Sequence, residues 1–326
     1  MKITRRTALL GLAAASLARP ALARSAHADG ANWPERPIRL IVPVAPGGSQ
    51  DIVARHSAHA LSQALGQPVQ VENLPGGGSN IGYDAAARAR PDGYTWLAGS
   101  DTLSITGSLT PHLPYDPLAF APIHRTVRVP QILVVAANSP HADLASFVAA
   151  ARENAPAVGT PGSGSLAHLL LELAQQASES TWIHVAYRGG ALALNDLMAG
   201  HLQGVMINIG AVTEHVREGR LRGLAVSSEG RTLALPEVPT LTEQGFAGLT
   251  ALGWHGLVAP AGTDPAILAR VNAASRAAVK EPELAARLQA LGVEPTDETP
   301  EVLAEVIRAD AERWGAVVRR VGIVAG

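Results

Sequence analysis

The residues best suited to hold a ligand lie in short loops rich in glycine and hydroxyl side chains, and each loop adjoins a predicted strand. Two of these loops span residues 46–49 and 159–165. Small side chains let backbone N–H groups approach a ligand, and the N–H groups at a helix N-terminus are unpaired and carry partial positive charge. Successive N–H groups also form a concave site for an anion. Two such loops facing each other predict a carboxylate site that needs no lysine or arginine.

Six residues of these two loops are expected to supply the anion site: Gly47, Gly48, Ser49, Ser163, Gly164 and Ser165. Further ligand contacts are expected at or near other strand ends, from Val44, Ser100, Asp101, Thr102, Thr160, His168, Tyr187, Gly189, Asn208 and Trp254. Each loop taken alone is equally well explained as a turn followed by a helix N-cap. Several such loops together favour a binding site, because ligands of open α/β sheets bind beyond the carboxyl ends of the strands.

Two features hint at an enzyme, and both are weak. Gly162-x-Gly164-x-x-Ala167 fits the looser dinucleotide-binding fingerprint, but the next strand ends without an acidic residue to hold a ribose. Ser165 and His168 lie three residues apart on one predicted helix face. A nucleophile and its base have that spacing in principle, but an N-cap and a histidine lining the helix explain it better. We therefore expect neither catalysis nor a cofactor.

A metal site is not expected either. His56 and His59 share a face of a predicted helix, but no third ligand lies near them in the sequence. A solvated helix face explains them better, and the same holds for Asp310 with its neighbours Glu312 and Arg313. Aromatic residues make up 4% of the chain, and no basic patch accompanies them, so nucleic acid is not an expected partner.

The order of predicted elements positions these loops. Short β-rich runs alternate with segments of helical periodicity, which indicates an α/β fold. We expect strands at residues 38–42, 68–72, 95–99, 131–137, 157–159, 182–187, 205–209, 224–227 and 253–258. We expect helices at residues 50–64, 81–90, 144–153, 166–178, 191–199, 211–218, 264–280, 282–291 and 300–321, with Ser49 and Asp143 as N-caps.

The regular alternation breaks near residues 105–130 and 228–252, which are expected to be connections. This predicts two lobes with mostly parallel sheets, joined by a hinge of two crossovers with a cleft between them. One lobe comprises residues 29–130 with 253–326, and the other comprises residues 131–252.

Residues 1–28 are predicted to be a signal peptide and not part of the fold. Lys2, Arg5 and Arg6 precede an apolar run at residues 8–17, and two small-x-small cleavage sites follow. Paired arginines leave the Sec and twin-arginine export routes both open. Removing this segment takes away basic residues and no acidic ones. The remaining acidic chain would not attract anions by its overall charge, so any anion must be bound by local dipoles.

Longer motifs, in order along nearly the whole mature chain, point to one family. They include Trp33-Pro34-x-Arg36-Pro37, Pro46-Gly47-Gly48-x-x-Asp51, Pro91-Asp92-Gly93-Tyr94-Thr95, His184-Val185-x-Tyr187-Arg188-Gly189 and Trp254-x-Gly256-Leu257-x-Ala259-Pro260. With these motifs the chain resembles the substrate-binding proteins of tripartite tricarboxylate transporters, the Bug receptors. The combination is far more specific than any single motif.

The resemblance implies a type II periplasmic-binding-protein fold whose two lobes close on the ligand. It implies a carboxylate held largely by backbone N–H groups and waters from residues 44–49 and 160–165, and delivery to a membrane permease of one large and one small subunit. The expected function is thus a periplasmic, monomeric receptor for a small di-, tri- or aromatic carboxylate. A ligand sensor docking on a signalling protein, or an exported enzyme, remain the alternatives.

Two departures from the family pattern bear on the ligand. The family usually has Phe where Val44 stands, so the pocket wall is expected to admit a larger ligand. The family often has Asp where Asn208 stands, and that Asp can partner a ligand amino group. A neutral Asn208 therefore predicts a ligand without a cationic amine, unless Asp101 takes over that role. Asn208 as a helix cap and Asp101 as a solvated loop residue are the structural alternatives.

Overall fold

The structure is a computed structural model, and it describes residues 32–323. The predicted signal peptide, residues 1–28, lies outside the described residues. Between residues 32 and 323, no helix has the length and apolar character needed to cross a membrane.

The strands of the described chain form one continuous sheet. Their bounds are β1 Ile38–Val42, β2 Val69–Asn73, β3 Thr95–Ser100, β4 Ala121–Ala136, β5 Ala157–Thr160, β6 Ile183–Ala186, β7 Gly204–Asn208, β8 Leu221–Val226, β9 Leu252–Ala259 and β10 Glu294–Pro295. The main order across the sheet is β2-β1-β3-β9-β4-β7-β5-β6, and β8 and β10 also pair with β4. The early strands thus occupy one end of the sheet and the middle strands the other, with β9 and β4 between them.

Strand direction changes at this junction. β1 pairs in parallel with β2 and β3, and β5 pairs in parallel with β6 and β7, as expected. β4 and β9 carry the chain in opposite directions between the two ends, and they pair antiparallel with each other and with their other neighbours. The fold is therefore mixed α/β, and the expectation of mostly parallel sheets holds only for the two outer sets.

β4 is the largest departure from the expected elements. Residues 105–130 are predicted as a connection, but they contain most of a helix and the first part of this 16-residue strand. Arginine side chains interrupt the apolar pattern expected of a buried strand. The carboxylate that pairs with them lies far along the chain, so a local pattern does not predict it. Glu298 accepts hydrogen bonds from Arg125 Nη2 at 2.6 Å and from Arg128 Nη2 at 3.0 Å.

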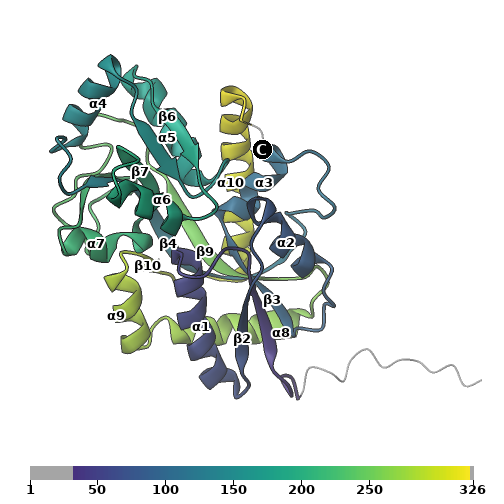
Figure 1. The fold of residues 1–326 in the computed structure, drawn as a ribbon. Helices are drawn as coiled ribbons and strands as arrows, with labels where there is room; N and C mark the ends of the chain where they lie inside the picture. Colours follow the sequence, from purple (N-terminus) through teal and green to yellow (C-terminus); the bar gives the residue numbers. More distant parts are fainter. Residues whose placement is uncertain (1–31, 324–326) are drawn as a thin grey trace, which may run out of the picture.

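The helices cover both faces of the sheet, as Figure 1 shows. Their bounds are α1 Ser49–Leu65, α2 Asn80–Ala87, α3 Asp101–Leu109, α4 Leu144–Glu153, α5 Leu166–Ser178, α6 Gly190–Met198, α7 Thr213–Arg217, α8 Pro265–Ala278, α9 Pro282–Ala290 and α10 Pro300–Val321, with short 3-10 turns η1 Gly77–Ser79 and η2 Ile209–Ala211. Asp143 caps α4 as predicted, accepting a hydrogen bond from the Ser146 N–H at 2.7 Å.

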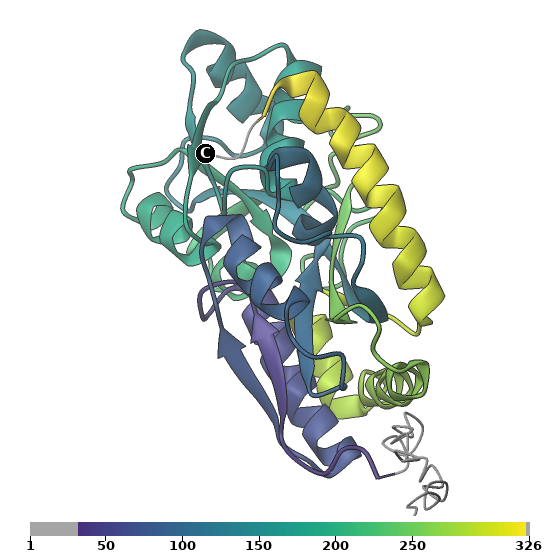
Figure 2. The same ribbon diagram turned by 90° about the vertical axis from the view of Figure 1, so that its right-hand side faces the viewer.

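Apolar side chains fill the space between the helices and the sheet. Trp96 and Leu40 lie in the cluster of the first end, and Phe147 lies in that of the second. Burying such a side chain contributes about 1.5–3 kcal/mol. Trp314 of α10 belongs to the same cluster as Phe147, and α10 contacts α3, β4 and α5. Figure 2 shows this long helix along one flank of the molecule, so it packs on both ends of the sheet.

Candidate functional site

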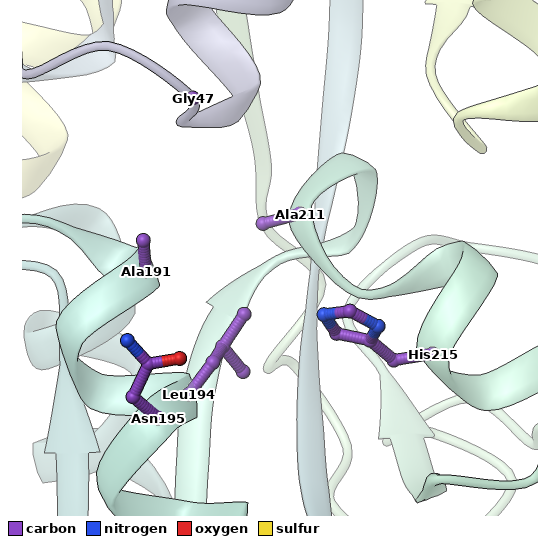
Figure 3. A pocket seen from close by; sticks show the side chains of 6 residues that line it. All are labelled: Gly47, Ala191, Leu194, Asn195, Ala211 and His215. Atoms are coloured by element: carbon purple, nitrogen blue, oxygen red, sulfur yellow. The ribbon is translucent and has the colours of Figure 1, made fainter.

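A hollow with a volume of about 120 Å³ lies where the loop before α1 meets α6, η2 and α7. Figure 3 shows the residues that line it: Gly47, Ala191, Leu194, Asn195, Ala211 and His215. Because α1, α6 and η2 each follow a strand closely, the hollow lies beyond the carboxyl ends of β1, β6 and β7. This is where open α/β sheets bind ligands.

The N-terminus of α1 at this hollow is uncapped. Gly48 is the N-cap, so the prediction that Ser49 is the cap is wrong. Glycine has no side chain to offer, and in the described chain no acceptor pairs with the N–H groups of Ser49, Gln50 or Asp51. These are the unpaired donors of a 17-residue helix. They leave a partial positive charge at the edge of the hollow.

Asp51 fixes the loop that leads into α1. Its Oδ2 accepts hydrogen bonds from the Gly47 N–H at 2.9 Å and from Arg55 Nε at 3.0 Å, and its Oδ1 accepts one from Asn73 at 2.8 Å. Burial opposes ionisation of this carboxyl, but the hydrogen bonds outweigh it and hold the pKa of Asp51 below its usual value. The carboxylate is therefore occupied within the loop, and the Gly47 N–H is not free for a ligand.

Ser49 joins the two ends of the sheet. Its buried Oγ lies 3.2 Å from Nε2 of His255 in β9, and a Cβ placed on Gly210 of η2 would lie 2.8 Å from the same Oγ. Only glycine allows that approach. Burial lowers the pKa of His255 to about 4, so its imidazole is neutral near pH 7. The Ser49 hydroxyl is thus engaged between elements, and the residue is left to meet a ligand through its backbone N–H.

The N-terminus of α5 is capped by its own side chains. Ser165 Oγ accepts a hydrogen bond from the His168 N–H at 3.3 Å and donates one to the Gly162 carbonyl at 2.8 Å. The Gly164 N–H donates to Nδ1 of His168 at 2.9 Å. Gly164 has a φ of +74° and packs against Leu109. Ser163 is exposed. None of these loop residues lines the hollow.

His168 and Thr160 belong to a side-chain cluster behind this loop. The His168 and His184 rings stack with centroids 3.6 Å apart, and Thr160 Oγ1 lies 2.7 Å from His184 Nε2. Glu172 lies 3.5 Å from the other ring nitrogen of His168. Burial and then the neighbouring His168 lower the pKa of His184 to about 4. The cluster holds the α5 loop in place.

Asp101 and Trp254 lie in the interior, away from the hollow. Ser100 is the buried N-cap of α3, and Asp101 in its first turn is 5% exposed. The Trp254 N–H donates to Asp101 Oδ1 at 3.4 Å, and the Trp254 indole donates to Asp310 Oδ2 at 3.1 Å. Burial and then the charge of Asp310 raise the pKa of Asp101 to about 7. The interpretations of Asp101 and Asp310 as solvated residues are therefore wrong.

The remaining predicted residues occupy separate positions. The Tyr187 hydroxyl donates to Asp196 at 2.6 Å, and Gly189 is the N-cap of α6 with a φ of +126°. Asn208 is half-buried at the N-cap position of η2, but its side chain makes no capping hydrogen bond. Val44 packs against the apolar cluster of the first end, and Thr102 is half-buried in α3.

Of the predicted residues, Gly47 is the one that lines the hollow. Five lining residues were not predicted: Ala191, Leu194, Asn195, Ala211 and His215. Asn195 and His215 have a signal in retrospect, since each is a polar residue in a short helix that follows a strand end. No acidic side chain lines the hollow, as far as the described residues show. Its polar groups are amide, imidazole and backbone groups, which favour an anionic ligand over a cationic one.

Comparison with known proteins places the chain among transport receptors. A sequence model of the tripartite tricarboxylate transporter family receptor matches residues 53–323. The chain is similar to protein BugT of Bordetella pertussis, with 36% identity over 99% of each chain. Its fold matches the periplasmic binding protein BugD, with a TM-score of 0.85, 30% identity, and coverage of 90% of this chain and 99% of BugD. It also matches Rpa4515 of R. palustris with adipate, with a TM-score of 0.86, 30% identity, and coverage of 90% and 99%.

Proposed function

The chain belongs to the tripartite tricarboxylate transporter family of receptors, and we propose that it captures a small organic carboxylate in a cleft between two lobes. The family consists of solute-binding receptors and not of enzymes. A similar protein has been solved with adipate, a dicarboxylate, which supports a carboxylate as the ligand class. The mixed α/β fold is that of periplasmic binding proteins.

The observation that carries the proposal is the uncapped N-terminus of α1 beside the hollow. Three unpaired N–H groups there offer hydrogen bonds and partial positive charge to a carboxylate. Gly47 lines the hollow directly before them. Hydrogen bonds to an ionised acceptor are about twice as strong as neutral ones, so such a site needs no lysine or arginine.

The proposed lobes are residues 29–130 with 253–326 and residues 131–252. The hollow lies between them, with Gly47 on one side and α6, η2 and α7 on the other. Its volume of about 120 Å³ is below the range in which most ligand pockets fall, about 300–1,000 Å³. We therefore propose that the lobes open to admit the ligand and close around it, with β4 and β9 as the hinge.

The proposed ligand carries no ammonium group. Asn208 is neutral, and Asp101, the other candidate partner for an amine, is buried against Trp254 and Asp310. Val44 packs against the apolar cluster of the first end and does not line the hollow, so it does not enlarge the hollow itself. The occupied receptor would then deliver its ligand to a membrane permease of one large and one small subunit, after export by the predicted signal peptide.

A thermal-shift screen of the refolded, ligand-stripped protein tests this function. The panel contains di- and tricarboxylates, aromatic carboxylates, amino acids and nicotinamide nucleotides. A ligand at about 100 times its dissociation constant stabilises the fold by about 2.7 kcal/mol, which gives a clear shift in melting temperature. A shift with a carboxylate and no product on incubation supports the receptor. A shift with a nucleotide alone, or product formation, contradicts it.

A further inference from the structure

Two polar side chains line the wall of the hollow opposite α1. Asn195 comes from α6 and His215 from α7, and Figure 3 shows them on either side of Leu194. His215 Nδ1 is shielded from solvent and has no hydrogen-bond partner in the described chain. No hydrogen bond within the described chain engages this side chain, so the edge of the ring that faces the hollow is available to a ligand.

The charges around His215 pair with one another. On α7 and just after it, Glu214 pairs with Arg217 at 3.0 Å, and Glu218 pairs with Arg220. These pairs leave no single carboxylate committed to the imidazole. Burial and then the positive charge of Arg220 hold the pKa of His215 below its usual value, so the ring is neutral at pH 7 without a ligand.

The elements packed around the hollow also lack a free counter-ion. In α6, Asp196 accepts the Tyr187 hydroxyl and lies 3.6 Å from His201. In α1, Asp51 is held by Arg55 and the loop. A ligand anion entering the hollow would therefore be the nearest unpaired negative charge to His215. An opposite charge within about 4–6 Å favours the charged form of a titratable group.

We propose that His215, together with Asn195, binds a second carboxylate of the ligand and that its imidazole takes up a proton from solvent when it does so. The inference rests on the carboxylate-receptor function proposed above and narrows its ligand to short-chain dicarboxylates. One carboxylate accepts hydrogen bonds from the N–H groups of α1, and the other accepts them from the imidazolium and the Asn195 amide. The two groups approach the ligand from opposite sides of the hollow.

Isothermal titration calorimetry with matched acids tests the assignment. Succinate and butyrate share four carbons, and adipate and hexanoate share six, so each pair differs by one carboxylate. At pH 6.5 we expect one dicarboxylate to bind at least about tenfold more tightly than its partner, because it adds charge-assisted hydrogen bonds. Titrations in two buffers with different ionisation enthalpies should show proton uptake. The affinity should fall between pH 6.5 and pH 8, while the carboxylates stay ionised.

His215→Gln keeps a hydrogen-bond donor but cannot carry the proton. Proton uptake and the change of affinity with pH should disappear, and dicarboxylate affinity at pH 6.5 should fall about tenfold with little change for the monocarboxylate. Asn195→Ala should weaken dicarboxylate binding and leave proton uptake in place. His201→Gln is the matched control, since that side chain is 70% exposed and does not line the hollow, and it should leave both unchanged.

The possible outcomes distinguish failure of the His215 proposal from failure of the carboxylate-receptor function on which it rests. Dicarboxylate binding without proton uptake by the unaltered protein overturns the role of His215 and leaves the receptor function standing. Unchanged proton uptake in His215→Gln also overturns the role of His215 and leaves the receptor function standing. Circular dichroism checks that the variant is folded. Absence of binding by every acid in the panel overturns both. Measurements on the unaltered protein suffice if a variant fails to fold.

Discussion

The N-termini of α1 and α5 have similar sequences, but that of α1 is uncapped and that of α5 is capped by a side chain. Both helices follow a strand and a loop of glycine and serine, and both are expected to bind an anion. At α5, Ser165 and His168 supply the acceptors for the loop's N–H groups. At α1, Gly48 supplies none, and the first N–H groups remain open beside the hollow.

The difference shows that a glycine- and serine-rich loop is not a binding site by composition alone. A helix N-terminus can satisfy its donors with its own side chains or leave them for a ligand. The position of serine decides between these outcomes here. Ser165 stands at the N-cap of α5, whereas Ser49 stands one residue inside α1 and turns its hydroxyl towards His255.

The largest difference between the two loops should appear in stability. A Cβ on Gly164 would lie 2.2 Å from Leu109 Cδ1, in a left-handed backbone conformation. We expect Gly164→Ala to lower the free energy of unfolding by about 3 kcal/mol, from overpacking and backbone strain together. Gly47→Ala, with a φ of +87° but open space around the Cβ, should cost only about 1 kcal/mol. Urea denaturation measures both, and equal losses would mean that the α5 loop is not fixed more tightly.

Ligand affinity should be more sensitive to substitutions in the α1 loop than in the α5 loop. Gly48→Asp places a carboxylate over the open N–H groups of α1, and its Cβ meets no atom within 4 Å. We expect about a 100-fold loss of carboxylate affinity, or about 2.7 kcal/mol, because the new side chain occupies the donors and repels the anion. Ser163→Asp in the exposed α5 loop is the matched control and should change affinity by less than about threefold. Equal losses in calorimetry would restore the view that both loops bind the ligand.

The N-terminus of α3 differs from both. It has no side-chain cap and does not line the hollow, and a buried carboxyl, Asp101, lies in its first turn. The pKa of Asp101 is about 7 in the folded protein, above its usual value, so the folded state holds more protons between about pH 4 and pH 7. The contribution of Asp101 to stability therefore falls as pH rises through that window. Asp101→Asn should raise stability at pH 8 relative to its effect at pH 4, by up to about 4 kcal/mol, because one pKa unit corresponds to about 1.4 kcal/mol. Parallel pH profiles of the urea midpoint for both proteins would contradict the buried, protonated carboxyl.

The smallest effect should come from removing the α5 cap. Ser165→Ala takes away the acceptor of the His168 N–H, and loss of a serine N-cap typically costs about 1 kcal/mol. Carboxylate affinity should stay within twofold, because this loop does not line the hollow. Thermal unfolding and calorimetry on one preparation give both values. A large loss of affinity with little loss of stability would move the ligand to α5.

Sequence patterns predicted the local elements well, whereas Gly47 is the one predicted site residue that lines the hollow. The bounds of α4, α5 and α10 agree with the prediction, because their caps and apolar periodicity are local signals. The first part of β4 was missed because Arg125 and Arg128 are balanced by Glu298, far along the chain. Asn195 and His215 line one hollow only after α6 and α7 have packed on the sheet, and no local sequence pattern predicts this.

The pairing of β3 with β9 also bears on the order in which the protein folds. Leu97 lies opposite Val258, so the sheet that carries the open end of α1 closes only after most of the chain has been synthesised. Contacts between residues so distant in sequence are slow to form, because the entropy of loop closure must be overcome first. At the other end of the sheet, β5, β6 and β7 lie close together in sequence and can pair earlier. The half that bears the open α1 N-terminus is therefore the last to mature.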